Sequence, residues 1–220
     1  MNKDMIKAVI FDLDGTLLDT IGDLSDSMNY ILSAYGFPEH TQEEIKSYVG
    51  NGLHKLVERA VPAGTDSARI DEMFRALVAY YRAHCAVKTR PYEGIPALLS
   101  SLRHAGIQTA VISNKADNSV QALAEEMFEN AFDFALGQTE GVPLKPDAAM
   151  VNLALEKLAC KANEAVYVGD SEVDIETARN AKMPCISVTW GFRTKDVLLK
   201  NGAEHFADRP EEILRIIRAH

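Results

Sequence analysis

The chain alternates short apolar runs with stretches of helical periodicity. Short apolar runs bounded by turn residues are typical of buried strands in a parallel sheet, and their alternation with helices is typical of βαβ units. The pattern therefore predicts an α/β fold, a doubly wound parallel sheet with a Rossmann-like core. The predicted strands lie at residues 9–11, 109–112, 132–136, 165–168 and 185–188.

Between the first and second predicted strands, apolar positions recur at helical spacing instead. Four helices are predicted in this stretch, which contains a Thr41–Glu44 capping box and a loop at residues 50–52 with two glycines. The first strand belongs with the later ones, so the helices form an insert in the sheet domain. We expect a core domain of residues 1–15 and 89–220 and a four-helix cap of residues 16–88.

The composition is ordinary for a globular protein, and the negative net charge disfavours anionic partners. With 220 residues, of which 47% are hydrophobic, the chain can bury one sizeable core and a smaller accessory domain. Its formal net charge of -9 does not favour a nucleic-acid backbone or an anionic membrane surface as the main partner. An anionic substrate would need a local positive charge.

Neither the cysteines nor the N-terminal residues predict export. Cys85, Cys160 and Cys185 lack a C-x-x-C spacing, so we expect no disulfide framework and no zinc site, and we expect all three to be small buried residues. Asp12 interrupts the first apolar run too early for a signal-peptide core, and no apolar stretch reaches about 18 residues. A cytoplasmic monomer or homodimer with no membrane partner is expected.

Two aspartates, Asp12 and Asp14, follow the first predicted strand and precede a glycine turn. The carboxyl ends of parallel strands are where such folds bind ligands, so both carboxylates should lie at the mouth of a site. Carboxylates are costly to place in a partly dry crevice unless a cation neutralises them, and oxygen ligands suit a hard cation. The pair therefore predicts a Mg²⁺ site, against the simpler interpretation of solvated acids at a strand end.

A hydroxyl, an amide and a lysine follow the next two predicted strands. Ser113 and Asn114 come directly after residues 109–112, and the Ser113 hydroxyl and the Asn114 backbone N–H suit a phosphoryl oxygen. Such residues also cap helices. Lys145 lies in a loop after the third predicted strand, where it is either a solvated residue or a positive charge that offsets the carboxylates.

A second pair of acids, Asp170 and Asp174, follows the fourth predicted strand. Asp170 comes at the end of that strand and Asp174 one helical turn later, so both can face a metal. The alternative is that Asp170 only caps the helix and that Asp174 is exposed.

These polar positions, taken together, resemble the four motifs of the haloacid dehalogenase superfamily, and the resemblance covers essentially the whole chain. It implies that Asp12 is a nucleophile that forms an aspartyl-phosphate, and that Asp14 protonates the leaving oxygen and then activates water. The matching positions are Asp12-x-Asp14-Gly15-Thr16, Ser113, Lys145 and Gly169-Asp170-x-x-x-Asp174.

The same resemblance implies how a metal and a substrate are held. Mg²⁺ would be bound by the Asp12 carboxylate, the Asp14 backbone carbonyl and the Asp170 carboxylate, with Asp174 in a supporting position. Ser113 and Lys145 would hold the phosphoryl oxygens. The substrate-binding residues expected in the core are Leu13, Asp14, Ser113, Asn114 and Lys145.

Two further segments resemble a phosphoglycolate phosphatase-like subgroup of that superfamily. In such enzymes a glycine-flanked cap loop closes over the substrate, so Asn51, Gly52 and Leu53 are candidate specificity residues. The expected function is Mg²⁺-dependent hydrolysis of a small phosphorylated metabolite. The segments are Gly15-Thr16-Leu17-Leu18-Asp19-Thr20 and Val49-Gly50-Asn51-Gly52-Leu53.

Other functions stay open on the sequence alone. An inorganic pyrophosphatase or a broad-specificity sugar or nucleotide phosphatase would carry the same four motifs. A non-catalytic phospho-accepting or binding module could keep the fold, since fold does not imply function. Such a module is disfavoured, because it would be expected to lack the nucleophile or an acid, and none of the motif positions is lost.

Overall fold

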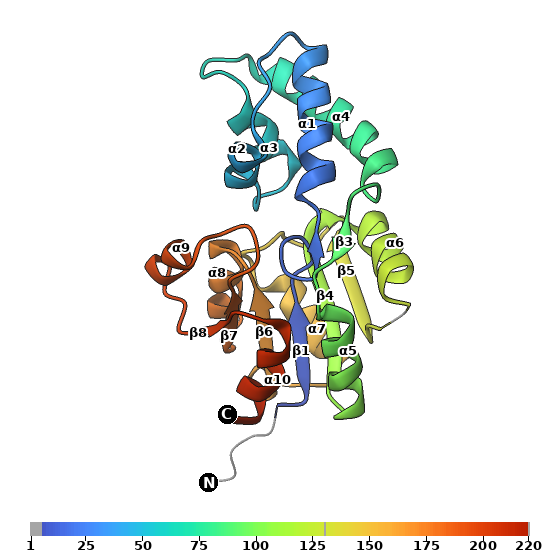
Figure 1. Ribbon diagram of the computed structural model, residues 1–220, viewed down its shortest axis with the longest axis vertical. Helices are drawn as coiled ribbons and strands as arrows, with labels where there is room; N and C mark the ends of the chain where they lie inside the picture. The colour runs from blue at the N-terminus through green and yellow to red at the C-terminus, as the bar shows by residue number, and fades with distance from the viewer. Residues whose placement is uncertain (1–5, 130, 220) are drawn as a thin grey trace. The chain divides into compact units, whose positions relative to one another are not determined.

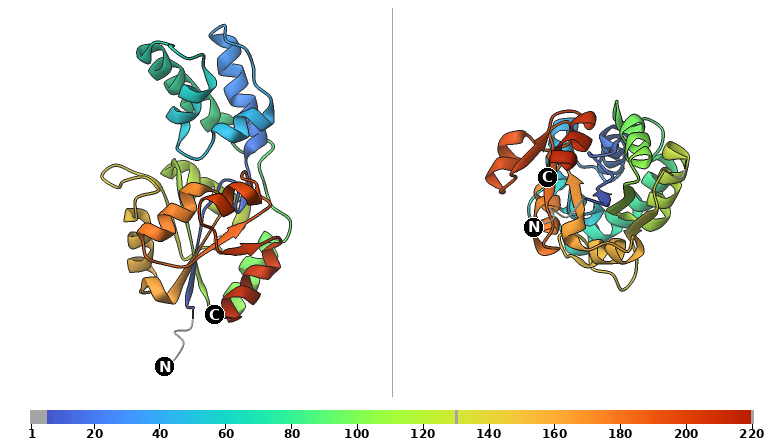
Figure 2. Two further views of the ribbon diagram at one scale, coloured as in Figure 1. Left: turned by 90° about the vertical axis from the view of Figure 1, so that its left-hand side faces the viewer. Right: turned by 90° about the horizontal axis from the view of Figure 1, so that it is seen from below.

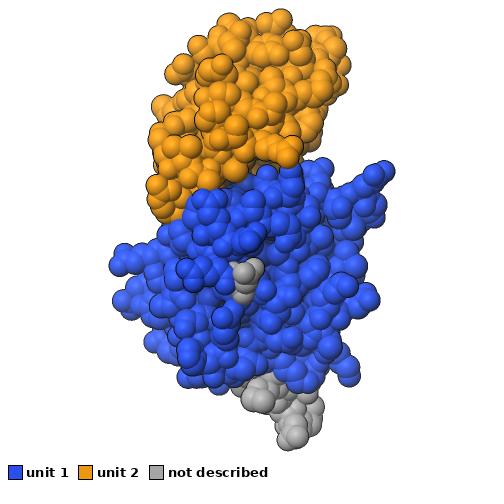
Figure 3. Space-filling model, turned by 90° about the vertical axis from the view of Figure 1, so that its right-hand side faces the viewer, with its two compact units in different colours: residues 1–18, 91–220 blue, residues 19–90 orange. Residues whose placement is uncertain are grey.

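The structure, a computed structural model, describes residues 6–129 and 131–219 (Figure 1). The first five residues of the expected core segment, together with residues 130 and 220, therefore lie outside the described residues. The chain divides into two compact units, coloured in Figure 3: the core unit, Met1–Leu18 with Pro91–His220, and the helical unit, Asp19–Arg90. The unit boundaries follow residues 18 and 90, whereas the predicted domain boundaries follow residues 15 and 88.

In the described part of the core unit, six parallel strands form one sheet. They are β1 (Ala8–Phe11), β4 (Gln108–Ala116), β5 (Phe134–Gln138), β6 (Ala165–Gly169), β7 (Cys185–Val188) and β8 (His205–Ala207). The order across the sheet is β5-β4-β1-β6-β7-β8, so the strand order reverses beside β1. This arrangement confirms the predicted doubly wound α/β fold, in which ligands bind where the order reverses.

β4 is longer than predicted, and β8 was not predicted. β4 continues to Ala116, with a shift in its pairing to β5 between Ile112 and Ala116. Ser113 and Asn114 were predicted to follow this strand, but they belong to it. β8 has only three residues and begins with a histidine, so it carries no apolar run that the sequence could display.

Helices cover both faces of the sheet (Figure 2). α5 and α10 contact each other on one face, and α7 and α8 lie on the opposite face. This arrangement buries the sheet on both sides, which is why its strands read as continuous apolar runs. The core helices are α5 (Ile95–His104), α6 (Asp117–Phe128), α7 (Ala149–Lys157), α8 (Glu172–Asn180), α9 (Lys195–Lys200), α10 (Pro210–Ala219) and the short 3₁₀ helix η1 (Ala162–Glu164).

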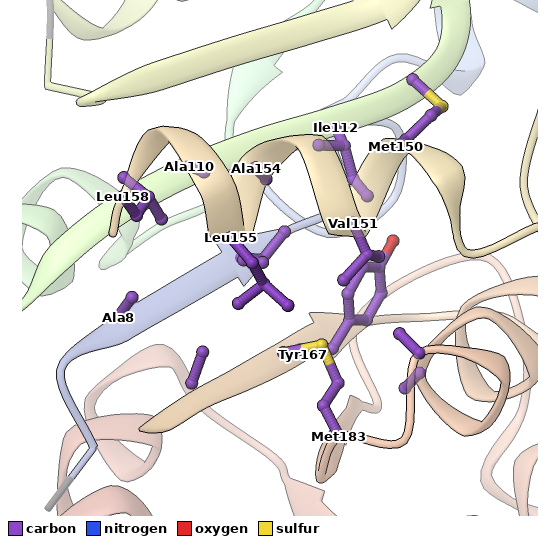
Figure 4. Packing of buried hydrophobic residues seen from close by; sticks show 14 residues of the cluster. Ala8, Ala110, Ile112, Met150, Val151, Ala154, Leu155, Leu158, Tyr167 and Met183 are labelled. Atoms are coloured by element: carbon purple, nitrogen blue, oxygen red, sulfur yellow. The ribbon is translucent and has the colours of Figure 1, made fainter. Parts of the chain in front are cut away.

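The core between the sheet and α7 is a cluster of buried apolar residues that includes one tyrosine (Figure 4). Ala8 and Ile10 of β1 are fully buried there, and Val151 and Leu155 of α7 pack into the same cluster. Tyr167 of β6 is also fully buried in this cluster, although it carries a hydroxyl that needs a hydrogen-bond partner. That partner is found at the carboxyl end of the sheet, as described below.

The helical unit contains four helices within residues 19–90, all of which are described, as the periodicity predicted. They are α1 (Ile21–Ala34), α2 (Gln42–Tyr48), α3 (Leu53–Ala60) and α4 (Ser67–His84). α1 contacts α2 and α4, and α3 contacts α2 and α4. The predicted Thr41–Glu44 capping box is present at the start of α2.

Where the chain passes between the units, β2 (Leu18–Asp19) pairs with β3 (Arg90–Pro91). Within the helical unit, the buried Asp23 carboxylate accepts hydrogen bonds from the backbone N–H groups of Lys88 and Thr89 at 2.8 and 2.9 Å. It also accepts one from the Thr89 hydroxyl at 2.8 Å. These bonds tie the beginning of α1 to the end of the unit.

Two smaller expectations can be compared with the described residues. The cysteines form no disulfide there, but all three are half-buried rather than fully buried. No helix in the described part of the chain combines the length and apolar character that a membrane crossing needs.

Candidate active site

The candidate site is built at the carboxyl ends of β1, β4 and β6. Asp12 directly follows β1, Ser113 lies near the end of β4, and Asp170 directly follows β6. Because these three strands are parallel neighbours, their polar ends meet at one edge of the sheet. Residues far apart in the sequence are thereby brought together.

Lys145 is buried at the centre of this cluster, so it is not a solvated loop residue. Its Nζ atom lies 2.6 Å from Oδ1 of Asp12 and 2.8 Å from Oδ1 of Asp174. It also donates to the hydroxyl of Tyr167 at 3.1 Å. The lysine therefore supplies the local positive charge that an anionic substrate would need in this acidic protein.

Asp174 is a fully engaged carboxylate on the first turn of α8, and it is 1% exposed. Its Oδ1 atom accepts from Lys145 and from the Tyr167 hydroxyl. Its Oδ2 atom accepts from the backbone N–H of Asp170 at 3.2 Å and from the N–H and hydroxyl of Ser171 at 3.1 and 2.6 Å. The alternative of an exposed Asp174 is excluded, and its role is to fix the lysine and the turn that carries Asp170.

Asp170 is held from two sides and is almost completely buried. Its Oδ2 atom accepts from the backbone N–H of Phe192 at 2.6 Å, and its Oδ1 atom accepts from the Thr16 hydroxyl at 3.2 Å. Burial is the main cause that raises the pKa of Asp170 to about 7, and the nearby charge of Asp174 raises it further. A cation at this position would favour the charged form.

The charges of Asp12 and Lys145 depend on each other. Burial raises the pKa of Asp12 well above its usual range, and Lys145 opposes that shift while Asp174 and Asp170 add to it. Burial alone would lower the pKa of the Lys145 ammonium, but Asp12 and Asp174 outweigh that effect and raise it. The lysine is therefore held as a cation beside the carboxylate.

A metal ion fits the acidic cluster of Asp12, Asp170 and Asp174. Among the described residues, each of these aspartates offers a carboxylate oxygen within 4.8 Å of the others. When all three are ionised, the Lys145 ammonium neutralises only one of the three charges, so a divalent cation would balance the remainder. Since the oxygens of Asp174 already accept several hydrogen bonds, Asp12 and Asp170 are the better placed ligands.

The Asp14 side chain is not a member of that cluster. Lys115, 8% exposed at its side chain, lies with its Nζ 2.9 Å from Oδ1 of Asp14, and the Ser113 hydroxyl lies 3.5 Å from Oδ2. Lys115 was not predicted as a site residue. Side chains two positions apart on a strand point to the same face, so the spacing from Ser113 was the available signal.

Two of the expected substrate-binding residues support the site through other contacts. The Leu13 side chain is fully buried, and its carbonyl accepts from the N–H groups of Leu17 and Leu18 at 3.0 Å, which forms the turn that carries Asp14. The side-chain amide of Asn114 is hydrogen-bonded to the backbone of Lys145. The prediction for Asn114 concerned only its backbone N–H.

The turn at Gly15 and Thr16 and the segment around Phe192 both contact Asp170. A Cβ atom at Gly15 or Gly191 would overlap the Asp170 carboxylate, so both positions need glycine. The Trp190 indole N–H donates to the Thr16 carbonyl at 3.0 Å, which holds these two segments together. The sequence resemblance includes Trp190 and Gly191, but the contact of this segment with Asp170 was not predicted, because a backbone N–H group makes it.

The predicted specificity residues lie in the helical unit, at the start of α3. Gly52, with φ of 84°, precedes Leu53, the first residue of that helix. The Asn51 side-chain oxygen accepts from Nη2 of Arg59 at 2.7 Å, and Nη1 of Arg59 donates to the Tyr48 carbonyl at 2.7 Å. Arg59 therefore braces the loop, whose predicted role in specificity stays a prediction.

The fold and the site define the class of protein: a Rossmann-like α/β protein with a buried acid cluster and a lysine at the strand ends. Residues 9–188 match the sequence pattern of the family described as haloacid dehalogenase-like hydrolase, and the chain belongs to that family.

Several relatives are similar over nearly the whole chain. A phosphoglycolate phosphatase of Agrobacterium fabrum is 36% identical over 196 residues, 87% of this chain and 84% of the relative. An N-acetylmuramic acid 6-phosphate phosphatase of Pseudomonas aeruginosa is 29% identical over 99% of this chain and 97% of its own length. A crystal structure from Lactobacillus delbrueckii subsp. bulgaricus, provisionally described as a phosphoglycolate phosphatase, is 36% identical with a TM-score of 0.93, covering 97% of this chain and 98% of the other.

Proposed function

We propose that this protein is a Mg²⁺-dependent phosphatase that hydrolyses a small organic phosphomonoester through an aspartyl-phosphate on Asp12. One observation carries the proposal: the Asp12 carboxylate lies 2.6 Å from a buried ammonium, that of Lys145, and beside the buried Asp170. A nucleophile, a cation and a further acidic ligand are thereby collected at one strand end. Phosphatase relatives that cover most of the chain support the same reaction class.

In the first step, an oxygen of Asp12 attacks phosphorus as the bond from phosphorus to the leaving oxygen breaks. The leaving oxygen takes a proton from Asp14, so the alcohol departs neutral and Asp14 becomes a carboxylate. Lys145 and the Ser113 hydroxyl hold the phosphoryl oxygens as negative charge is redistributed among them.

In the second step, water attacks the phosphorus of the aspartyl-phosphate and gives its proton to Asp14. The bond between Asp12 and phosphorus breaks, inorganic phosphate leaves, and both aspartates return to their starting states. Asp14 therefore acts as an acid and then as a base. General acid–base catalysis of this kind contributes about 10²- to 10⁴-fold to the rate.

Mg²⁺, held by the Asp12 and Asp170 carboxylates and the Asp14 backbone carbonyl, would supply charge neutralisation for the anionic substrate. Asp174 keeps Lys145 and the Asp170 turn in place for that purpose. Without the ion, the carboxylates would repel an incoming phosphate. Excess chelator should therefore stop phosphate release, and added Mg²⁺ should restore it.

The substrate that we favour is 2-phosphoglycolate, because phosphoglycolate phosphatases recur among the relatives. A second candidate, N-acetylmuramic acid 6-phosphate, is favoured by the Pseudomonas aeruginosa relative, which is similar over 99% of this chain. The transferred phosphoryl group is the same in both, so the leaving group must be distinguished outside the core motifs. Asn51, Gly52 and Leu53 are the proposed specificity residues.

A phosphate-release panel tests the proposal. It includes 2-phosphoglycolate, N-acetylmuramic acid 6-phosphate, sugar phosphates, nucleotides and pyrophosphate, each with Mg²⁺ and with chelator. Mg²⁺-dependent release from one organic phosphate far above the rest is the expected result. Preference for pyrophosphate would replace the substrate assignment, and no release from any compound would contradict the phosphatase proposal.

A further inference from the structure

The side-chain amide of Asn114 pairs with the backbone of Lys145 through two hydrogen bonds. Its Oδ1 atom accepts from the Lys145 N–H at 2.8 Å, and its Nδ2 atom donates to the Lys145 carbonyl at 3.0 Å. Asn114 lies on β4, whereas Lys145 belongs to the loop between β5 and α7. One side chain thus satisfies both backbone groups of the lysine.

That loop needs an anchor, because Lys145 lies in neither a helix nor a strand. No regular hydrogen-bond ladder therefore fixes its main chain, yet its ammonium must reach Asp12 at 2.6 Å. A second amide, that of Asn180 on α8, donates to the carbonyl of the next residue, Pro146, at 2.8 Å. The Asn180 contact is exposed and single, so the two-bond contact of Asn114 is the stronger constraint.

We propose that Asn114 is a positioning residue, whose side chain fixes the main chain of Lys145 so that the ammonium faces the Asp12 carboxylate and the phosphoryl group. The role of the phosphoryl group in this statement rests on the proposed function. An amide suits this task because one planar group carries both a donor and acceptors, which match the N–H and C=O of a single residue. A carboxylate would lack the donor, and alanine would lack both.

The chain offers a matched control for the loss of this contact. Asn29 in the helical unit makes the same two-bond pairing with the backbone of His40, donating at 2.8 Å and accepting at 2.9 Å. Asn29→Ala and Asn114→Ala therefore remove the same number and kind of hydrogen bonds. Only Asn114 contacts the lysine. A loss of phosphate affinity in Asn114→Ala that Asn29→Ala does not show therefore reports positioning of Lys145 and not a general loss of stability.

The experiment measures the binding of inorganic phosphate in the presence of Mg²⁺ by titration calorimetry, together with kcat and KM on a working substrate. We expect Asn114→Ala to weaken phosphate binding by about 10- to 100-fold, the range seen when groups that orient a binding residue are removed. Asn29→Ala should bind phosphate as the wild type does. The backbone N–H of residue 114 is kept in the variant, so only the side-chain role is tested.

A double variant provides the decisive comparison. If Asn114 acts through Lys145, then adding Asn114→Ala to Lys145→Met should cause no further loss of phosphate affinity. The inference would be overturned if the double variant lost phosphate affinity by the product of the two single losses. It would also be overturned if folded Asn114→Ala bound phosphate as tightly as the wild type. Should Asn114→Ala fail to fold, Asn114→Ser, which keeps one hydrogen-bonding group, takes its place in the same comparisons.

Failure of the proposed function would look different. In that case Lys145→Met would itself bind phosphate as the wild type does, or no substrate in the panel would release phosphate. A Lys145→Met loss combined with an unaffected Asn114→Ala would leave the phosphatase proposal intact and refute the positioning role alone.

Discussion

The ammonium of Lys115 lies 2.9 Å from Oδ1 of Asp14, and both side chains are largely shielded from water at the edge of the sheet. The contact joins the end of β4 to the turn after β1. A carboxylate that must give and take a proton has to stay within reach of the leaving oxygen, so its position matters as much as its charge. Lys115 is the partner that holds the proposed acid–base residue.

Lys115→Met should therefore slow the hydrolysis of alkyl phosphates by about 10²-fold, the lower end of what general acid catalysis contributes. The loss should be much smaller for p-nitrophenyl phosphate, because its phenolate leaves without needing a proton. Steady-state kcat for 2-phosphoglycolate and for the aryl ester measures the difference. Equal losses on the two substrates would contradict the prediction, and Lys195→Met, at an exposed lysine 3.8 Å from Asp208, is the matched control.

Asp12→Asn should abolish turnover while the fold is kept. The amide is a poor nucleophile, and Lys145 retains its contact with Asp174, so the buried ammonium is not left without a partner. Phosphate release should fall to background with an unchanged circular dichroism spectrum. Asp196→Asn, at an exposed position on α9, should leave turnover unchanged. Turnover of Asp12→Asn at the wild-type rate would refute the assignment of the nucleophile.

The strands could be predicted from the sequence where burial on both faces makes them continuously apolar, as in β1 and β6. β8 could not, because three residues beginning with His205 carry no such pattern. The end of β4 was misjudged for a related reason. Ser113 and Asn114 are polar because they serve the site, so their residue types hide the fact that the backbone is still a strand.

Asp12, Asp14 and Asp170 were predictable because they follow recognisable strands. Their supports were not. Tyr167 lies inside an apolar run and is indistinguishable there from a core residue until its hydroxyl is seen 3.0 Å from Asp174. Phe192 contributes only a backbone N–H, which every residue type except proline has. Contacts of these kinds depend on tertiary placement and leave no mark on residue type.

Gly191→Ala should weaken Mg²⁺ binding because the new methyl group would overlap Asp170 and the backbone of Gly15. The nearby backbone cannot yield easily, so Asp170 would be displaced. We expect at least about a tenfold loss of Mg²⁺ affinity, measured by calorimetry. Gly106→Ala is the control, since its φ of 71° makes alanine unfavourable but no atom lies within 4 Å of the added carbon. Loss of stability without loss of Mg²⁺ affinity in Gly191→Ala would contradict the prediction.

Asp170 also predicts how stability should depend on pH in the absence of metal. Its folded-state pKa is about 7, against an ordinary value of 3.8, chiefly because it is buried and secondly because Asp174 is nearby. Between pH 3.8 and about 7, Asp170 is therefore protonated in the folded protein and ionised in the unfolded chain. The contribution of Asp170 to stability is therefore fully present below about pH 4 and is lost progressively as the pH rises towards about 7.

Mg²⁺ should reverse that trend, because a cation stabilises the ionised carboxylate and must compete with its proton. The rise in Tm caused by saturating Mg²⁺ over chelator should be larger at about pH 8 than at about pH 5.5, which differential scanning calorimetry can measure. Asp170→Asn has no carboxyl group to titrate, so the pH-dependent part of this rise should shrink sharply. An equal Mg²⁺-induced rise at both pH values in the wild type would mean that Asp170 does not bind the ion.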